Sequence, residues 1–334
     1  MKSITFDAPW LIFLGNAKDN LHAKTGHGLV DWRRENCLAQ LRYPGCGADL
    51  GLPEMAPAEA AAAGARSLII GVAPVGGALQ PEWTRTLIEA LEAGLDIVSG
   101  MHMPLTSVPA LADAAVRSGR KLIDIRRPPA DIPAASGRKR SGKRILMVGT
   151  DCAVGKKYTA LALHGAMLEK GMDATFRATG QTGIMIAGGG MPMDAVVSDF
   201  LSGAAEVLSP DNAPEHWDVI EGQGSLFHPA YAAVTLGLLH GSQPDAMVLC
   251  HQAGRTTIED YPDYPIPPLE ECIRRYEEAA ALTNPAARCI GLSINTAGLS
   301  PAARANVLAH YNEETGLLCV DPIATGVQAL LDRL

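Results

Sequence analysis

The chain has 334 residues and a net charge of −8, from 28 Lys plus Arg and 36 Asp plus Glu. With 47% hydrophobic and 19% charged residues, it is neither a disordered nor a fibrous protein. Its length is that of one large domain or two modest ones, and its acidic balance argues against coating nucleic acid or an anionic membrane.

Seven cysteines are scattered along the chain and none forms a CxxC pair. This pattern is typical of reduced thiols rather than of a disulfide framework or a zinc site. The start, MKSITFDAPWLIFLG, has only a short apolar run and no small-residue cleavage site, so we expect no signal peptide. No apolar run is long enough to span a membrane. We therefore expect a cytoplasmic protein.

The first third of the chain alternates short apolar runs with helical patterns. Strands are expected at residues 10–14, 67–72, 96–99 and 121–125, and helices at 83–93 and 111–118. This order predicts a parallel sheet with helices on its faces, which we assign to a Rossmann-like domain over residues 1–128. Residues 24–53 show no periodicity and are expected to form a long irregular loop. A Gly-rich turn is expected at 73–78.

A change in composition marks the end of this domain. Residues 126–144, RRPPADIPAASGRKRSGKR, combine prolines, small residues and a basic cluster without apolar periodicity. We interpret residues 129–143 as a linker between two α/β domains. The basic cluster at 138–143 could contact a phosphate group of a ligand, but we expect it to be a solvated part of the linker.

The alternation resumes after the linker and continues to the end of the chain. Strands are expected at 145–148, 174–178, 217–220, 246–250, 289–294 and near 319. Helices are expected at 156–170, 194–201, 269–282 and 301–311. The pattern indicates a doubly wound sheet, so we assign residues 144–334 to a second domain of P-loop NTPase type.

The strongest motif is the strand ILMV followed by GTDCAVGKKYTA. A strand, a Gly-rich turn and a Gly-Lys pair that opens a helix are typical of a phosphate-binding loop, whose backbone N–H groups surround an anion. Lys156 supplies a positive charge to a bridging phosphate oxygen. The predicted phosphate-binding residues are Gly149, Thr150, Asp151, Cys152, Ala153, Val154, Gly155, Lys156, Lys157 and Tyr158.

Two features of this loop differ from the common pattern. Five residues rather than four separate Gly149 from Gly155, and Lys157 replaces the Ser or Thr whose hydroxyl normally holds Mg²⁺. Thr159 could substitute for that hydroxyl, although it lies two residues further along the helix. The loop is therefore suited to a pyrophosphate that is not cleaved, such as that of coenzyme A.

The second motif, WDVIEGQGSLFHP, places Glu221 directly after a buried strand and beside a Gly-rich turn. Acidic groups at such strand ends often have perturbed pKa values and functional roles. Glu221 could bind a metal, act as a general base or cap the turn. His228 is a possible catalytic partner, with a structural role as the alternative.

Two further segments carry polar side chains after a strand. Arg177, Gln181 and Thr182 lie in FRATGQTGIMIAGGG, where glycines allow a ligand to approach. Arg255 lies in VLCHQAGRTTIEDYP and could bind a carboxylate through two parallel hydrogen bonds. The alternative is that Arg255 bonds to loop carbonyls.

The P-loop together with the EGQG segment resembles dethiobiotin synthetase. Over nearly the full length, the chain is more similar to the D-glutamate N-acetyltransferase family, long catalogued as a domain of unknown function. That resemblance rests on KTGHGLVDWRRENCLAQLRYPGCGADLGLP, GVAPVGG, TGQTGIMIAGGG, EGQGSLFHP and LLHGSQPDAMVLCHQAGR.

The resemblance implies acetyl transfer from acetyl-CoA, as a cosubstrate, to the amino group of D-glutamate. It implies no metal, no nucleic acid and no membrane, and it favours a homo-oligomer. Glu221 is then the first candidate for the general base and His228 the second, while Lys156 and backbone N–H groups stabilise the oxyanion. Arg177, Arg255 and Lys24 are candidates for binding the two carboxylates.

Three alternatives remain open. An ATP-dependent ligase or kinase of the dethiobiotin synthetase type could act on a small carboxylate. The chain could instead be a nucleotide-binding switch without turnover. The ligase or kinase and the switch both rely on Mg-nucleotide, so the missing hydroxyl at Lys157 argues against both. Within the acetyltransferase hypothesis, Cys152 could carry the acetyl group, because a thiol at a helix N-terminus can have a lowered pKa.

Overall fold

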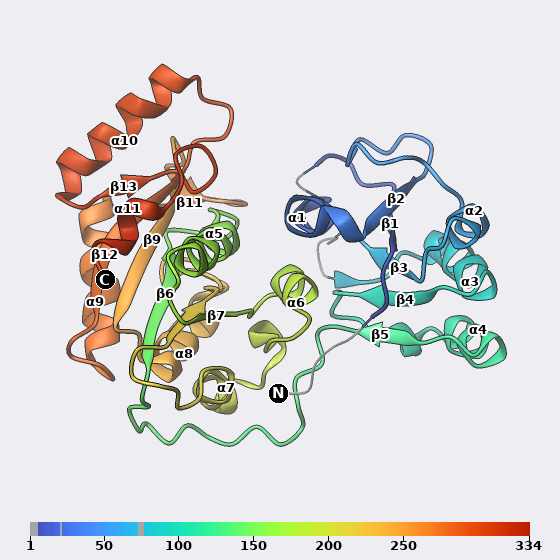
Figure 1. Cartoon of the computed structure of the whole chain (residues 1–334), viewed down its shortest axis with the longest axis horizontal. Coiled ribbons are helices and arrows are strands. Elements are labelled where there is room, and N and C mark those ends of the chain that lie inside the picture. The colour runs from blue at the N-terminus through green and yellow to red at the C-terminus, as the bar shows by residue number, and fades with distance from the viewer. Residues whose placement is uncertain (1–5, 21, 73–76) are drawn as a thin grey trace. The chain divides into compact units, whose positions relative to one another are not determined.

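The computed structural model of the chain describes residues 6–20, 22–72 and 77–334, which divide into two compact α/β units (Figure 1). The N-terminal unit comprises the residues up to Arg127 together with Gln181–Ala195. The P-loop unit comprises Pro128–Gly180 and Val196–Leu334. The predicted α/β fold class is confirmed.

The N-terminal unit is built on a five-stranded parallel sheet in the order β2-β1-β3-β4-β5. Its strands are β1 (Trp10–Gly15), β2 (Cys37–Arg42), β3 (Ser67–Ile70), β4 (Asp96–Ser99) and β5 (Leu122–Asp124). Helices α2 (Pro57–Ala62), α3 (Thr84–Glu92) and α4 (Pro109–Ser118) lie on one face and α1 (Lys24–Arg33) on the other (Figure 1). Because helices cover both faces, β1, β3 and β4 are buried at every position.

The expectation of an irregular loop over residues 24–53 was wrong. This stretch contains α1, a 3₁₀ turn at Arg34–Asn36 and the edge strand β2. The two glycines of α1 lower its helix propensity, and β2 is only partly buried, so neither element has a strong pattern in the sequence. The Gly-rich turn expected at 73–78 lies mostly outside the described residues.

The P-loop unit contains a six-stranded parallel sheet in the order β13-β12-β9-β6-β8-β7. Its strands are β6 (Lys143–Gly149), β7 (Ala174–Arg177), β8 (Trp217–Ile220), β9 (Ala246–Gln252), β12 (Arg288–Asn295) and β13 (Cys319–Val320). Strand β6 lies between β8 and β9, where the strand order changes direction. Ligands of doubly wound sheets bind at the carboxyl ends of strands at such a switch point.

Alternating residues of the central strands point to two different helical layers. Ile145 and Met147 of β6 and Val248 of β9 join the core beneath α5 (Lys156–Glu169) and α11 (Gln328–Leu331). Helices α8 (Ala232–Ser242) and α9 (Leu269–Ala281) lie against the opposite face, with α7 (Leu201–Leu208) beside α8 (Figure 1). The remaining elements are α10 (Pro301–Thr315) and the hairpin β10 (Thr257–Ile258) and β11 (Tyr261–Pro265).

A short segment from the second half of the chain belongs to the N-terminal unit. Helix α6 (Gln181–Ala187) packs against α1, and the Thr182 hydroxyl donates a hydrogen bond to that of Thr25 over 3.2 Å. The helix expected at 194–201 was wrong, because the chain passes from one unit to the other between Ala195 and Val196. Two 3₁₀ turns, Met193–Ala195 and Ser198–Phe200, precede α7 there.

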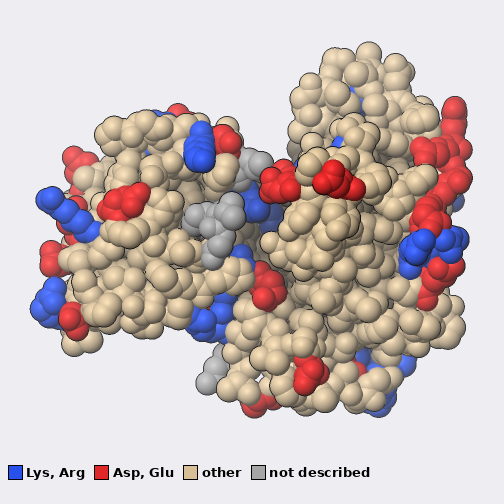
Figure 2. All heavy atoms as spheres, turned by 180° about the vertical axis from the view of Figure 1, so that it is seen from behind, with Lys and Arg blue, Asp and Glu red and all other residues tan. Residues whose placement is uncertain are grey.

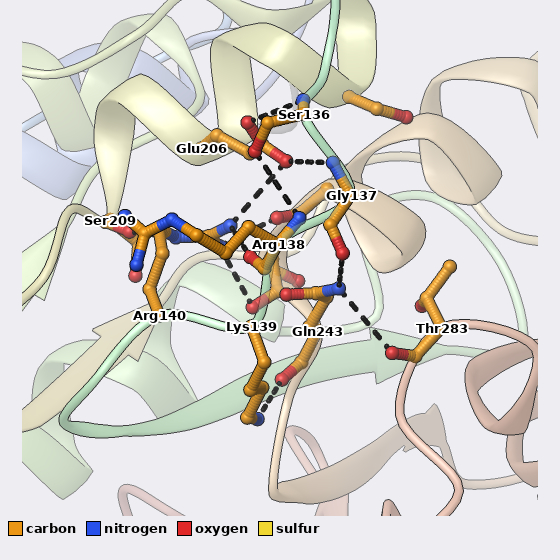
Figure 3. A network of polar contacts seen from close by, with 12 residues as sticks. Ser136, Gly137, Arg138, Lys139, Arg140, Glu206, Ser209, Gln243 and Thr283 are labelled. Carbon is orange, nitrogen blue, oxygen red and sulfur yellow. Dashed lines mark hydrogen bonds and ion pairs between the residues drawn. The ribbon is translucent and has the colours of Figure 1, made fainter.

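The basic linker is anchored on the P-loop unit (Figure 3). The Glu206 carboxylate accepts hydrogen bonds from the N–H groups of Ser136 and Gly137, each over 2.9 Å. Arg140 is 6% exposed and donates to the carbonyl oxygen of Ser209 over 2.7 Å. The expectation of a solvated basic cluster was therefore wrong for Arg140, whose charge is used inside the unit.

Figure 2 shows acidic side chains, with a smaller group of basic ones among them, along the outer edge of the P-loop unit. Helix α9 also carries side chains of both charges. There Arg274 makes ion pairs with Glu271 over 2.6 Å and with Glu278 over 2.5 Å. Among the described residues, none of the helices combines the length and the apolar character needed to span a bilayer.

Candidate active site

The turn between β6 and α5 has the backbone of an anion-binding loop. Gly155, the last residue before α5, has a φ of +106°, a conformation that a side chain would strain. Thr150 N–H donates to the Cys250 carbonyl over 3.0 Å, which fixes the loop to β9. The loop therefore lies at the carboxyl edge of the sheet with the positive end of α5 behind it.

Lys156 is buried in this loop. Its ammonium donates a hydrogen bond to the Asp151 carbonyl oxygen over 2.7 Å, and the residue is 7% exposed. Burial lowers the pKa of Lys156, and the negative charges of neighbouring groups, Asp151 and Glu221 among them, oppose that effect. An incoming phosphate would supply the negative charge that this buried cation lacks.

Lys157 and Thr159 are the two residues that bear on whether the loop has a hydroxyl for binding Mg²⁺. The Lys157 ammonium lies 4.9 Å from the centre of the Tyr158 ring. The Thr159 hydroxyl is fully buried, donates to the Gly155 carbonyl over 3.1 Å and lies 2.8 Å from the Ser293 hydroxyl. Thr159 is therefore part of the packing between α5 and β12 and is not positioned to replace the Mg²⁺-binding hydroxyl.

Glu221 follows β8 and is buried beside the loop. Its Oε2 atom accepts hydrogen bonds from the N–H groups of Thr179, over 2.9 Å, and Gly180, over 3.0 Å. Burial raises the pKa of this carboxyl, while the two N–H groups and then Lys157 and Lys156 oppose the rise. A buried carboxylate with a raised pKa and one oxygen held by the backbone has the properties of a general base.

The glycine after Glu221 allows this approach. A Cβ atom on Gly222 would lie 1.7 Å from the Met147 carbonyl oxygen and 3.0 Å from Cδ of Lys156. Only glycine can therefore bring the turn after β8 against β6 and the P-loop lysine. The EGQG pattern reflects this close packing of two strand ends.

Asp151 and Arg255 form an ion pair that fixes the phosphate loop. The fully buried Asp151 carboxylate accepts hydrogen bonds from Arg255 over 2.8 Å and from the N–H groups of Glu259, over 2.9 Å, and Cys152, over 2.6 Å. Arg255 also donates to the Cys152 carbonyl over 3.0 Å. The structure brings Arg255 to the site, where it holds the loop. Its contact with a substrate carboxylate stays a prediction.

His228 lies beside the same loop. One of its ring nitrogens, a carboxylate oxygen of Asp151 and the Cys152 sulfur all lie within 4.8 Å of one another. Such a trio can ligate a metal ion, but the Asp151 carboxylate already accepts three protein hydrogen bonds. We therefore interpret Asp151 as a structural anchor of the loop rather than as a metal ligand.

Arg177 points away from this cluster. Its Nε atom donates to Asp218 over 2.7 Å, and the Arg177 side chain is 18% exposed. Asp218 lies three residues before Glu221 in β8, about 10 Å back along the strand at ~3.3 Å per residue. The predicted contact between Arg177 and a substrate would require this ion pair to open.

The other predicted substrate-binding residues belong to the N-terminal unit. The side-chain amide of Gln181 is oriented so that its nitrogen donates to the Gly100 carbonyl and its oxygen accepts from the Arg126 guanidinium. Thr182 bonds to Thr25, and the side chain of Lys24 is exposed at the start of α1. The proposed roles of these three residues stay predictions.

Tyr276 of α9 is a residue that our sequence reasoning missed. Its buried hydroxyl donates to the Gly149 carbonyl over 2.7 Å and accepts from the Leu226 N–H over 3.1 Å. It therefore connects the start of the phosphate loop to the turn that carries Glu221 and His228. The sequence shows only an aromatic residue on an amphipathic helix, which is also typical of an ordinary core residue.

The chain matches two family descriptions that together cover most of its length. Residues 133–331 match a domain of unknown function described as the DUF1611 P-loop domain. Residues 42–128 match the Rossmann-like DUF1611 N-terminal domain. A crystal structure of a DUF1611 family protein from Anabaena variabilis is similar, with a TM-score of 0.90 and 37% identity over 98% of this chain and 99% of that chain.

Two curated relatives match over 98% of both chains. One, from Tritonibacter scottomollicae, is 49% identical and is named D-glutamate N-acetyltransferase. The other, from a Pseudoalteromonas species, is 45% identical and carries the same name.

Proposed function

The chain belongs to the DUF1611 family, and we propose that it is an acyltransferase that moves the acetyl group of acetyl-CoA to the amino group of D-glutamate. The observation that carries this proposal is the near full-length similarity to two proteins named for that activity. The site provides independent support, since a phosphate loop without the usual metal-binding hydroxyl lies beside a buried carboxylate.

The phosphate loop is proposed to hold the coenzyme's phosphates. Lys156 and the N–H groups at the start of α5 provide positive charge for a pyrophosphate. Mg-nucleotide hydrolysis would need a hydroxyl next to Lys156, where this chain has Lys157, and the Thr159 hydroxyl is committed to Ser293. The loop thus favours a bound, uncleaved pyrophosphate, which disfavours an ATP-dependent ligase.

Glu221 is proposed to be the general base. The substrate ammonium gives one proton to its carboxylate, and the freed amine attacks the thioester carbonyl carbon. A C–N bond forms, and the oxygen becomes an oxyanion that N–H groups stabilise. As the C–S bond breaks, the coenzyme thiolate leaves and takes up one proton. The third ammonium hydrogen stays on the amide, so one proton is released to solvent overall.

A thermal-shift panel tests the ligand class. Acetyl-CoA, coenzyme A, ATP and GTP are added with and without Mg²⁺, and the unfolding midpoint is measured. We expect acetyl-CoA and coenzyme A to raise the midpoint irrespective of Mg²⁺. Stabilisation by Mg-ATP but not by coenzyme A would overturn the proposal in favour of the ligase.

Replacing the base tests the mechanism. Glu221→Gln should lower kcat by about 10²–10⁴-fold while leaving acetyl-CoA affinity nearly unchanged. Glu215→Gln is the matched control, because the Glu215 side chain is 84% exposed and pairs with Lys143 at the surface. If kcat of the Glu221 variant equals that of the control, Glu221 is structural.

We further propose a cytoplasmic homo-oligomer that requires no metal. No disulfide joins the cysteines of the described residues, as is typical of a reducing compartment, and the chemistry above uses only protein groups. Light scattering gives the mass in solution, and activity after EDTA treatment tests the metal. A monomer, or activity lost to EDTA and restored by a divalent cation, would contradict the corresponding statement.

A further inference from the structure

His228 is held in one position by its surroundings. The backbone N–H of His228 donates a hydrogen bond to the Ser225 carbonyl over 3.1 Å, and the residue is 3% exposed. The imidazole contacts the ring of Tyr231, with centroids 4.4 Å apart, and the ring of Tyr261 at 5.1 Å. The ring is therefore unable to turn freely.

The backbone determines which nitrogen of His228 carries the proton. The N–H of Ala230 donates a hydrogen bond to Nδ1 over 3.1 Å. A peptide N–H can only donate, so Nδ1 must present a lone pair. In a neutral imidazole the single proton is then on Nε2.

The charged groups around the ring do not reverse this state. Burial lowers the pKa of His228, and Lys156 acts in the same direction, whereas Asp151 and Asp260 favour the charged ring. The Asp151 carboxylate is already neutralised by Arg255. We therefore expect a neutral ring at physiological pH, with no free lone pair on either nitrogen.

We propose that His228 is a neutral hydrogen-bond donor whose Nε2–H stabilises the acetyl carbonyl oxygen as it becomes an oxyanion, and that it is not a general base. This inference rests on the proposed acetyl transfer and narrows the role of one residue in it. No proton leaves the ring during the step, because the carbonyl electrons move to oxygen while the amine attacks. A base at Nδ1 would have to break the bond to Ala230, and a base at Nε2 would have to lose its proton first.

Nuclear magnetic resonance of ¹⁵N-histidine-labelled protein tests the protonation state directly. Long-range proton–nitrogen correlations identify the tautomer, and the His228 signals are assigned by their loss in His228→Gln. We expect the Nε2–H tautomer at neutral pH. An Nδ1–H tautomer or an imidazolium at neutral pH would overturn the proposal, whatever reaction the enzyme catalyses.

Kinetics of two variants test the catalytic role. His228→Ala should lower kcat by about 10²–10³-fold, the usual cost of one oxyanion donor. His228→Gln should recover at least about tenfold of that loss, because the Gln amide can place an N–H near the position of Nε2. The acid limb of the kcat/KM profile should be the same in His228→Gln as in the wild type.

Controls separate failure of this inference from failure of the proposed function. The control is His310→Gln in α10, because the His310 side chain is 71% exposed. Its kcat should match that of the wild type. Thermal midpoints and coenzyme A affinities of the His228 variants show whether the fold is intact. Equal inactivity of the Ala and Gln variants with a lost acid limb would indicate a base and overturn the inference. If the wild type does not transfer acetyl groups, the proposed function is wrong. The resonance experiment would still identify the tautomer of His228.

Discussion

The hydroxyl of Tyr276 donates a hydrogen bond to the carbonyl oxygen of Gly149 over 2.7 Å, and so joins α9 to the first residue of the phosphate loop. The Tyr276 hydroxyl oxygen in turn accepts a hydrogen bond from the N–H of Leu226 over 3.1 Å, in the turn that follows Glu221. Burial raises the pKa of this phenol, so it stays protonated and can donate. One buried hydroxyl thereby fixes the spacing between the phosphate loop and the turn that carries Glu221 and His228.

Replacing Tyr276 with Phe should loosen both loops. It leaves a buried carbonyl and a buried N–H without their partner, at a cost of about 1–3 kcal/mol. We expect a lower thermal midpoint and a KM for acetyl-CoA that rises about three- to tenfold, with a smaller change in the KM for D-glutamate. Tyr264→Phe is the control, since Tyr264 is 49% exposed. An unchanged KM for acetyl-CoA would show that the bridge is dispensable.

Variants of Asp151 and Arg255 test whether this ion pair holds the phosphate loop or whether Arg255 binds the substrate. If Arg255 acts by holding the loop, Arg255→Ala and Asp151→Asn should both weaken acetyl-CoA binding, and the double variant should be little worse than either single variant. If Arg255 binds a substrate carboxylate, Arg255→Ala should raise mainly the KM for D-glutamate. Steady-state kinetics of the three variants, with both substrates varied, distinguish these outcomes.

Cys152 provides a test of a covalent route. Its thiol lies in the phosphate loop beside His228. The Nδ1 lone pair of that imidazole already accepts the Ala230 N–H, and in the tautomer proposed above Nε2 carries the proton, so neither nitrogen would accept the thiol proton. We therefore expect direct transfer, and Cys152→Ala should keep turnover within a few-fold of the wild type. Cys46→Ala, a change at another partly buried thiol outside this loop, is the control. Loss of turnover together with an acetylated Cys152 in the wild type, detected by mass spectrometry, would establish the two-step route.

His251 predicts how stability depends on pH. Burial, followed by the charge of Arg255, lowers its pKa from 6.5 to about 4, while Nδ1 lies 2.9 Å from the Thr150 hydroxyl. Because the folded state binds the proton less tightly than the unfolded state, the stabilisation is complete above about pH 6.5 and is lost as pH falls toward about 4. The difference corresponds to at most about 3 kcal/mol.

The variant His251→Gln removes this titration. Its thermal midpoint should therefore depend less on pH between about 4 and about 6.5 than that of the wild type. His310→Gln, at an exposed site, should follow the wild-type curve. Parallel curves for His251→Gln and wild type would show that His251 does not titrate in this range.

The parts of the fold that the sequence predicts well are those with strong local patterns. The strand at β4 and the strand before Glu221 have their predicted limits, because apolar runs between turns are typical of strands buried on both faces. The edge strand β2 and the Gly-containing helix α1 have weak patterns and were missed. Only tertiary structure shows that α6 leaves the domain in which its sequence neighbours lie.

The backbone arrangement of the site could be predicted from the sequence, but the pairing of its charged side chains could not. The Gly-Lys pattern correctly indicated where a strand, a turn and helix α5 would meet. Whether an arginine is available depends on distant partners, and the sequence does not show that Asp218 holds Arg177 or that Asp151 holds Arg255. Tyr276 is 127 residues from Gly149, so no local motif could connect the two.

The most direct test of the account is product formation by the purified protein. Acetyl-CoA and D-glutamate are supplied in buffer containing EDTA and no nucleotide, and free thiol and N-acetylated product are measured together. The account predicts equal amounts of coenzyme A and N-acetyl-D-glutamate, and a strong loss of both in Glu221→Gln but not in Glu215→Gln. A reaction that occurs only with Mg-ATP, or acetyl-CoA that is neither bound nor consumed, would contradict it.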